Sequence, residues 1–105
     1  MSYKWPDKDK DEIVDYSVDW SRFLKEDTIL GVTWSIKGDD GINVELFPAN
    51  IFKGLQFVSG TVSGQVATVR FSLGLNNIRY TVVCGISTGS GLHYERSIFL
   101  RVKEK

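Results

Sequence analysis

Apolar side chains recur at every second position over most of this 105-residue chain. In "RYTVVCGIS", for example, the alternate residues are Tyr80, Val82, Cys84 and Ile86. A period of two places successive side chains on opposite faces of a β-strand, so that one face can pack against a core while the other meets water. No stretch of useful length follows the 3.6-residue period of a helix. The pattern therefore predicts an all-β protein.

Seven segments carry this alternation, and clusters of Gly, Asn, Asp and Ser separate them. The predicted strands cover residues 13–20, 28–36, 42–46, 55–61, 65–72, 79–87 and 94–102. The side chains expected to face inward are Val14, Tyr16, Val18, Trp20, Leu30, Val32, Trp34, Ile36, Ile42, Val44, Leu46, Ala67, Val69, Phe71, Tyr80, Val82, Cys84, Ile86, Ile98, Leu100 and Val102. "SRFLKEDT" is predicted to be a connection with one turn of helix, and Ser63-Gly64 a hairpin turn. Seven short strands favour an immunoglobulin-like or fibronectin III-like antiparallel β-sandwich over a small barrel.

The length fits one domain, which we place at residues 13–105. Residues 1–12 lack a periodic pattern and are interpreted as an N-terminal arm, loosely ordered unless something receives it. Trp5 in this arm either packs onto the domain or is offered to a partner, because protein interfaces favour such aromatic anchors. Tyr3 and Trp5 are therefore possible interface residues.

The charge, the hydrophobicity and the cysteine content limit which partners and which cellular compartment we expect. The formal net charge is zero, from 13 basic and 13 acidic side chains, whereas nucleic-acid binders normally carry a basic excess. There is no apolar run long enough for a membrane span or a signal peptide, so neither nucleic acid nor membrane is an expected partner. Cys84 is the only cysteine, so no internal disulfide can form. We expect a chain of the cytosol, or of a particle assembled there.

Four acidic residues lie between positions 11 and 19, around the start of the first predicted strand. Asp15 and Asp19 share one face of that strand about 13 Å apart, whereas the paired carboxylates of glycosidases converge across a substrate at about 5–10 Å. An architectural role is therefore expected. We predict that these acids face outward and meet Arg96 and Arg101 of the closing strand, which would fix register and discourage edge-to-edge aggregation.

Other candidate chemistry has simpler structural explanations. "GDDGIN" lacks the alternating ligands of a calcium loop and has the composition of a hairpin turn. His93 is the only histidine, and Cys84 lies in phase with an inward face where a thiol is shielded, so a Cys–His nucleophile or a zinc site is not expected. We predict no catalytic residue, metal or cofactor. The remaining alternative is a carbohydrate-binding immunoglobulin-like module with exposed aromatic residues, although Trp20 and Trp34 fall in phase with apolar faces.

Four stretches resemble segments of two known families. "LNNIRYTVVCGIS" is similar to the fibronectin III strand that carries a Leu, then a Tyr, then alternating apolar residues, here Leu75, Tyr80, Val82, Cys84 and Ile86. "KDKDEIVDYSVDWS" resembles the opening of small virion proteins of tailed bacteriophages and prophages, whose pattern has proline where Lys10 stands. "YERSIFLRVKEK" resembles their closing segment, and "DTILGVTWSI" fits between.

These phage proteins are described as immunoglobulin-like fiber–tail adaptor or tail-associated proteins. The resemblance implies a non-enzymatic structural protein of a virion, which contacts other tail, fiber or connector proteins and can also form a homo-oligomer. It implies a place in the virion, and in the host cytoplasm during assembly. The residues that match its recurring positions are expected to form a framework that ties the first strand to the last: Asp15, Tyr16, Asp19, Trp20, Glu95 and Arg96.

Overall fold

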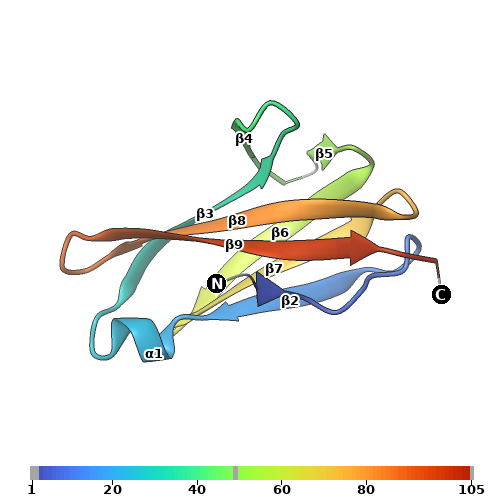
Figure 1. Ribbon diagram of the computed structural model, residues 1–105. Helices are drawn as coiled ribbons and strands as arrows, with labels where there is room; N and C mark the ends of the chain where they lie inside the picture. The colour runs from blue at the N-terminus through green and yellow to red at the C-terminus, as the bar shows by residue number, and fades with distance from the viewer. Residues whose placement is uncertain (1–2, 49, 105) are drawn as a thin grey trace.

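A computed structural model describes residues 3–48 and 50–104 of the chain, and Figure 1 shows its two layers of strands with one short helix. The elements are β1 (Tyr3–Lys4), β2 (Val14–Asp19), α1 (Ser21–Leu24), β3 (Ile29–Lys37), β4 (Asn43–Glu45), β5 (Ile51–Phe52), β6 (Leu55–Ser63), β7 (Val66–Leu73), β8 (Ile78–Thr88) and β9 (His93–Val102). The predicted seven strands correspond to β2, β3, β4, β6, β7, β8 and β9. The helical turn after the first of them is α1.

The strands form two sheets. One has the order β1-β9-β8-β3-β4 and the other the order β2-β7-β6-β5. All pairs are antiparallel except β1 with β9, which is parallel. The predicted hairpin at Ser63-Gly64 joins β6 to β7, and Gly64 has a φ of 61°, a left-handed conformation that suits glycine. The prediction of an all-β sandwich is confirmed.

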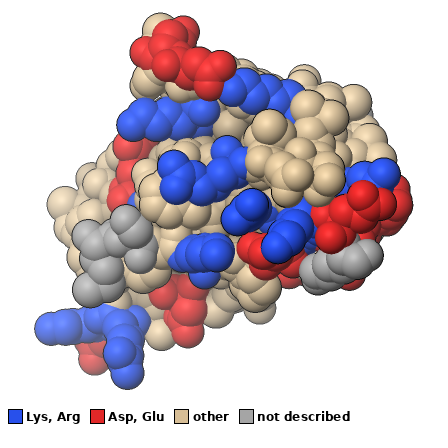
Figure 2. Space-filling model, turned by 45° about the vertical axis from the view of Figure 1, so that its right-hand side comes forward, with Lys and Arg blue, Asp and Glu red and all other residues tan. Residues whose placement is uncertain are grey.

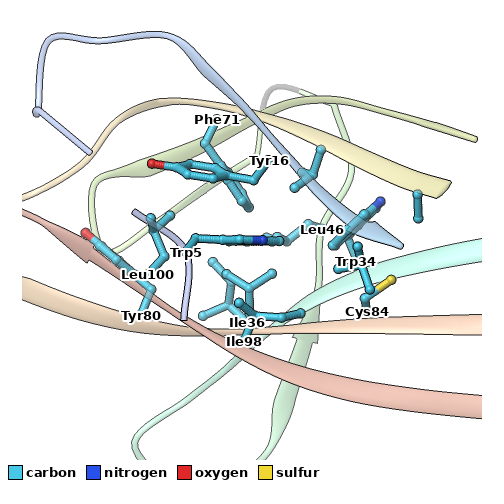
Figure 3. Packing of buried hydrophobic residues seen from close by; sticks show 14 of the residues in the cluster. Trp5, Tyr16, Trp34, Ile36, Leu46, Phe71, Tyr80, Cys84, Ile98 and Leu100 are labelled. Atoms are coloured by element: carbon cyan, nitrogen blue, oxygen red, sulfur yellow. The ribbon is translucent and has the colours of Figure 1, made fainter. Parts of the chain in front are cut away.

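The core lies between the two sheets and is built from the alternate residues of each strand that face inward. Tyr80, Val82, Cys84 and Ile86 of β8 are all buried, as the sequence pattern predicted. Figure 3 shows the ring of Trp5 in the middle of this core, with Tyr16 on one side and Ile36 and Ile98 on the other.

Three side chains expected to face inward are exposed. Leu30 is 73% exposed, because the register of β3 with β8 shifts between Ile29 and Gly31 and leaves Leu30 as an extra residue. Ile42 and Val44 are exposed because β4 is a short strand at the sheet edge. Leu46, just beyond β4, is buried as predicted.

The segment predicted as an arm runs along β9. Tyr3 and Lys4 pair with Ile98 and Phe99, and Lys8 forms a further parallel bridge with Val102. Met1 and Ser2 of the predicted arm lie outside the described residues. A two-residue strand has no detectable periodicity, so the sequence pattern gave no sign of this pairing.

Candidate interaction surfaces

The acids of the first long strand have partners other than those predicted. Asp15 forms two hydrogen bonds with the Arg70 guanidinium, at 2.7 Å to Nε and 3.1 Å to Nη2, and the two residues are register neighbours on β2 and β7. The predicted pairing with Arg96 or Arg101 is wrong, because β2 and β9 belong to different sheets. The hydrogen bond from Arg70 lowers the pKa of Asp15. The interaction therefore links neighbouring strands of one sheet.

Asp19 shapes the start of the helix. Its Oδ1 accepts the backbone N–H of Ser21 at 2.9 Å, and this hydrogen bond lowers the pKa of the carboxyl group. Among the earlier acids, Asp9 Oδ1 accepts the N–H of Asp11, and Glu12 Oε1 accepts the N–H of Asp9. Carboxylates that accept nearby backbone N–H groups are typical of turns and helix starts. These carboxylates therefore stabilise turns and the start of the helix through hydrogen bonds to nearby backbone N–H groups.

First and last strands meet through aromatic rings. The Arg96 guanidinium carbon lies 4.5 Å from the centre of the Tyr3 ring and 4.5 Å from that of the Trp20 ring. Asp19 and Arg96 line the same hollow of about 210 Å³, but no salt bridge between them is present in the described part of the chain. Glu95 points outward, with Oε2 3.9 Å from His93 Nε2. Arg96 of β9 thus makes cation–π contacts with Tyr3 of β1 and with Trp20, the residue that follows β2.

Of the two possible interface residues, one is buried. Trp5 stacks on Tyr16 with ring centres 4.8 Å apart, and its Nε1 donates to the Ser17 carbonyl at 3.1 Å. The Tyr16 hydroxyl donates to the Pro6 carbonyl at 3.0 Å, and burial raises the Tyr16 pKa to about 12. Trp5 is therefore tucked onto the domain, the first of the two expected alternatives. Tyr3 remains 37% exposed at the sheet edge.

Lys8 is a buried residue that the sequence pattern did not reveal. Its side chain is 0% exposed, and its Nζ donates to the carbonyls of Leu73 at 2.6 Å and Asp9 at 2.8 Å. Desolvation lowers its pKa. A lysine within a run of alternating charges normally lies in solvent, so no signal in the sequence distinguished this one.

The side chains considered for thiol chemistry or for sugar stacking are buried or lie apart. Burial raises the pKa of the Cys84 thiol to about 11, and Cys84 lies inside the core while His93 is exposed on β9. The part of the chain that the structure describes contains no group of three potential metal ligands and no helix that could cross a membrane. Trp5, Trp20 and Trp34 are all buried, so none of these three indoles is available for stacking on a sugar.

One side of the sandwich has two strand edges that are only partly covered. β4 pairs with β3 only at Ser35–Lys37, and β5 pairs with β6 only at Leu55 and Gln56. Within residues 3–48 and 50–104, residues 29–33 of β3 and 58–63 of β6 have no neighbouring strand on this side. Figure 1 shows β4 and β5 together at one end of the molecule, away from α1. We call these two exposed edges the open side.

A hollow of about 240 Å³ lies between the edges of the open side. Among its lining residues are Trp34 of β3 and Phe57 and Gly60 of β6. Trp34 is only 4% exposed, and its Nε1 is a buried donor without a hydrogen-bond partner. A Cβ at position 60 would lie 2.9 Å from this nitrogen, so glycine keeps the space clear. Val62, in register with buried Ala67, is 43% exposed. The hollow thus has largely apolar walls, and the unpaired Trp34 N–H lies buried close to Gly60.

Comparison with known proteins agrees with the motifs at the two ends of the chain. A model of the family described as podophage GP4 fiber-tail adaptor protein gp77 matches residues 8–101. None of the curated proteins matches. The family match covers nearly all of both sheets, and it confirms the resemblance to phage tail proteins. The chain belongs to the podophage GP4 fiber-tail adaptor protein gp77 family.

Proposed function

We propose that this chain joins a tail fiber to the tail of a phage particle by protein–protein contacts alone. The single observation that carries the proposal is the match of residues 8–101 to a fiber-tail adaptor family. Membership of that family gives the chain a structural role as a component of the phage tail. The described fold suits such a role, because a sandwich held by long antiparallel pairs is a rigid spacer with exposed edges.

We infer further that the sandwich is immunoglobulin-like. The strand orders β9-β8-β3-β4 and β2-β7-β6 correspond to the G-F-C-C′ and B-E-D orders of that fold. The Tyr80 hydroxyl near the start of β8 accepts the Leu75 N–H at 3.1 Å and donates to the Lys53 carbonyl. This arrangement is similar to the tyrosine corner of such domains, and it supports the resemblance of this stretch to fibronectin III domains.

Docking by strand addition at the open side fits an adaptor. An extended segment of a partner can hydrogen-bond the unpaired backbone of residues 29–33 or 58–63, while its alternate side chains enter the hollow. We expect many copies of the chain on one particle, so modest individual affinities suffice through multivalency.

We propose that the residues matching the recurring positions of the phage family hold the two ends of the chain together, so that the sandwich stays rigid in the adaptor. Trp20 and Arg96 hold β2 against β9, and Tyr16 holds the N-terminal segment through Pro6. Asp15 sets the register of β2 with β7, and Asp19 starts the helix. Glu95 contributes only on the outer surface of β9. We place the working protein in the virion, after folding in the host cytoplasm.

The experiment is deletion of the coding sequence from its phage, followed by electron microscopy and mass spectrometry of purified particles. We expect tails without fibers, and restoration of fibers by the wild-type chain. Fibers attached normally to particles without this chain would refute the adaptor role.

Complementation with variants tests the docking site separately. Val62→Lys places a charge on the unpaired edge of β6 and opposes strand addition, so fewer fibers should attach. Leu92→Lys, an equivalent change at an exposed residue between β8 and β9, is the matched control. If Val62→Lys restores fibers as well as Leu92→Lys does, docking does not use the open side, although the adaptor role stands.

A further inference from the structure

Basic side chains gather on the outer face of the five-stranded sheet. Arg79 of β8 and Arg101 of β9 lie directly opposite each other in register, and Lys37 lines the same hollow of about 170 Å³ as Arg79. Figure 2 shows Lys and Arg side chains in the middle of the visible surface, with Asp and Glu side chains at its margins. We call Lys37, Arg79, Phe99 and Arg101 the basic face.

No carboxylate of the described residues forms a salt bridge with a cation of the basic face. Within the described residues, none of Lys37, Arg79 and Arg101 forms a salt bridge. Like charges directly opposite each other on neighbouring strands destabilise a sheet. The chain has 13 acidic side chains to balance its 13 basic ones, and the nearby Asp39 pairs with Lys53 instead of with a cation of the basic face. Such a separation of charge is expected where a partner supplies the opposite charge.

One of these cations is held in place for binding. The Arg79 guanidinium carbon lies 4.6 Å from the centre of the Phe99 ring, and Phe99 is half-buried on β9. Contact with an aromatic ring orients the planar guanidinium and leaves its N–H edges free. Those edges can bind a carboxylate through two parallel hydrogen bonds. Phe99 adds an apolar surface beside the charges.

We propose that the basic face binds an acidic segment of another protein, in which carboxylates flank an apolar side chain. The identity of that protein as a tail component rests on the proposed function, whereas the binding chemistry does not. Nucleic acid is the less suitable ligand because carboxylates border the face. Asp39 pairs with Lys53 in the same hollow, and Glu104 pairs with Lys10 just beyond the end of β9. A long chain of phosphates would have to cross these acids.

The test measures binding of the full chain to a fluorescently labelled peptide Glu-Glu-Phe-Glu-Glu by anisotropy, with Gln-Gln-Phe-Gln-Gln as the uncharged comparison. The double variant Arg79→Ser/Arg101→Ser removes two cations from the basic face. Arg22→Ser/Lys25→Ser removes the same charge at α1 and is the matched control. We expect glutamate-peptide binding that weakens with salt, and that is at least about tenfold weaker in the double variant only. Equal loss in both variants, or equal binding of the two peptides, would overturn the proposal.

Two further measurements exclude other occupants. A short single-stranded oligonucleotide that binds at least as tightly as the glutamate peptide would overturn the proposal in favour of a phosphate ligand. Sedimentation that shows self-association of the wild-type chain, lost in Arg79→Ser/Arg101→Ser, would assign the face to a second copy. Weaker oligonucleotide binding and a wild-type monomer support an acidic protein partner. Fiber attachment is scored separately on particles, so a failed adaptor role leaves the peptide result intact.

Discussion

The ammonium group of Lys8 donates a hydrogen bond to the backbone carbonyl of Leu73 at 2.6 Å, across a sequence separation of 65 residues. The backbone of Lys8 is bonded as well, since its N–H reaches the Arg101 carbonyl at 3.0 Å and its carbonyl accepts the Lys103 N–H at 2.8 Å. Lys8 thereby fastens the N-terminal segment to the end of β9 and to the end of β7. It acts as a buried clasp between three parts of the chain.

We expect Lys8→Ala to lower the free energy of unfolding by about 2 kcal/mol, because two carbonyls lose their donor and the buried aliphatic stem is removed. Lys10→Ala, which removes a partly exposed lysine nearby, should have little effect. Urea unfolding followed by the fluorescence of the buried tryptophans measures both variants. Equal stability of Lys8→Ala and the wild type would show that the clasp contributes nothing.

Tyr80→Phe removes a hydroxyl that bridges Leu75 and Lys53. The Leu75 N–H and the Lys53 carbonyl, in part-buried hydrogen bonds, lose their partner, so stability should fall by about 1–2 kcal/mol. In Tyr94→Phe the lost hydroxyl has no hydrogen bond to the described residues, and the melting temperature should change little. Thermal unfolding by circular dichroism compares the two, and similar melting temperatures for both variants would contradict the role of Tyr80 as a corner residue.

Stability should fall in alkaline solution, in part through Cys84. The folded-state pKa of the thiol is raised by burial from 9.0 to about 11. Below pH 9 the thiol is neutral in both states; above it, the unfolded chain ionises first and unfolding is favoured. Relative to Cys84→Val, the wild type should lose up to about 1.4 kcal/mol per pH unit until the folded thiol also ionises. Identical pH profiles of the two proteins would show that Cys84 is not shielded.

The opposed arginines of the basic face predict a gain of stability on mutation. Arg101→Thr relieves the repulsion with Arg79, so the free energy of unfolding should rise by about 0.5 kcal/mol at low ionic strength, and the gain should shrink as salt is added. Arg22→Thr, which changes a residue of α1, serves as the control. Destabilisation by Arg101→Thr at every salt concentration would show that the two arginines do not repel each other.

The alternation of side chains predicted the long strands because each packs one face on the core. Ala67, Val69 and Phe71 are buried as expected, and so are Ile98, Leu100 and Val102. The alternation gives the wrong face where a strand contains an extra residue. The bulge at Leu30 is such a place, and it exposes a side chain that the pattern placed inside. The alternation also shows which face of a strand a side chain lies on, but it does not show which strands are neighbours. For that reason the sequence predicted arginines of β9 as partners for Asp15, whose partner is Arg70 of β7.

The surfaces proposed for binding were even less visible in the sequence. The open side exists because β4 and β5 are too short to cover β3 and β6, and strand length at an edge depends on tertiary packing. The basic face requires the register of β8 with β9, which brings Arg79 and Arg101 together from distant positions. The motifs at the chain ends did indicate the family, because they reflect shared ancestry and not local conformation.

Hydrogen exchange of the chain, free and within assembled fiber-bearing tails, tests the docking claim most directly. If a partner strand adds to the open side, backbone amides within residues 29–33 or 58–63 should exchange much more slowly in the assembly, while the β2–β7 pair changes little. Unchanged exchange at both edges, in particles that contain the chain and carry their fibers, would contradict the account.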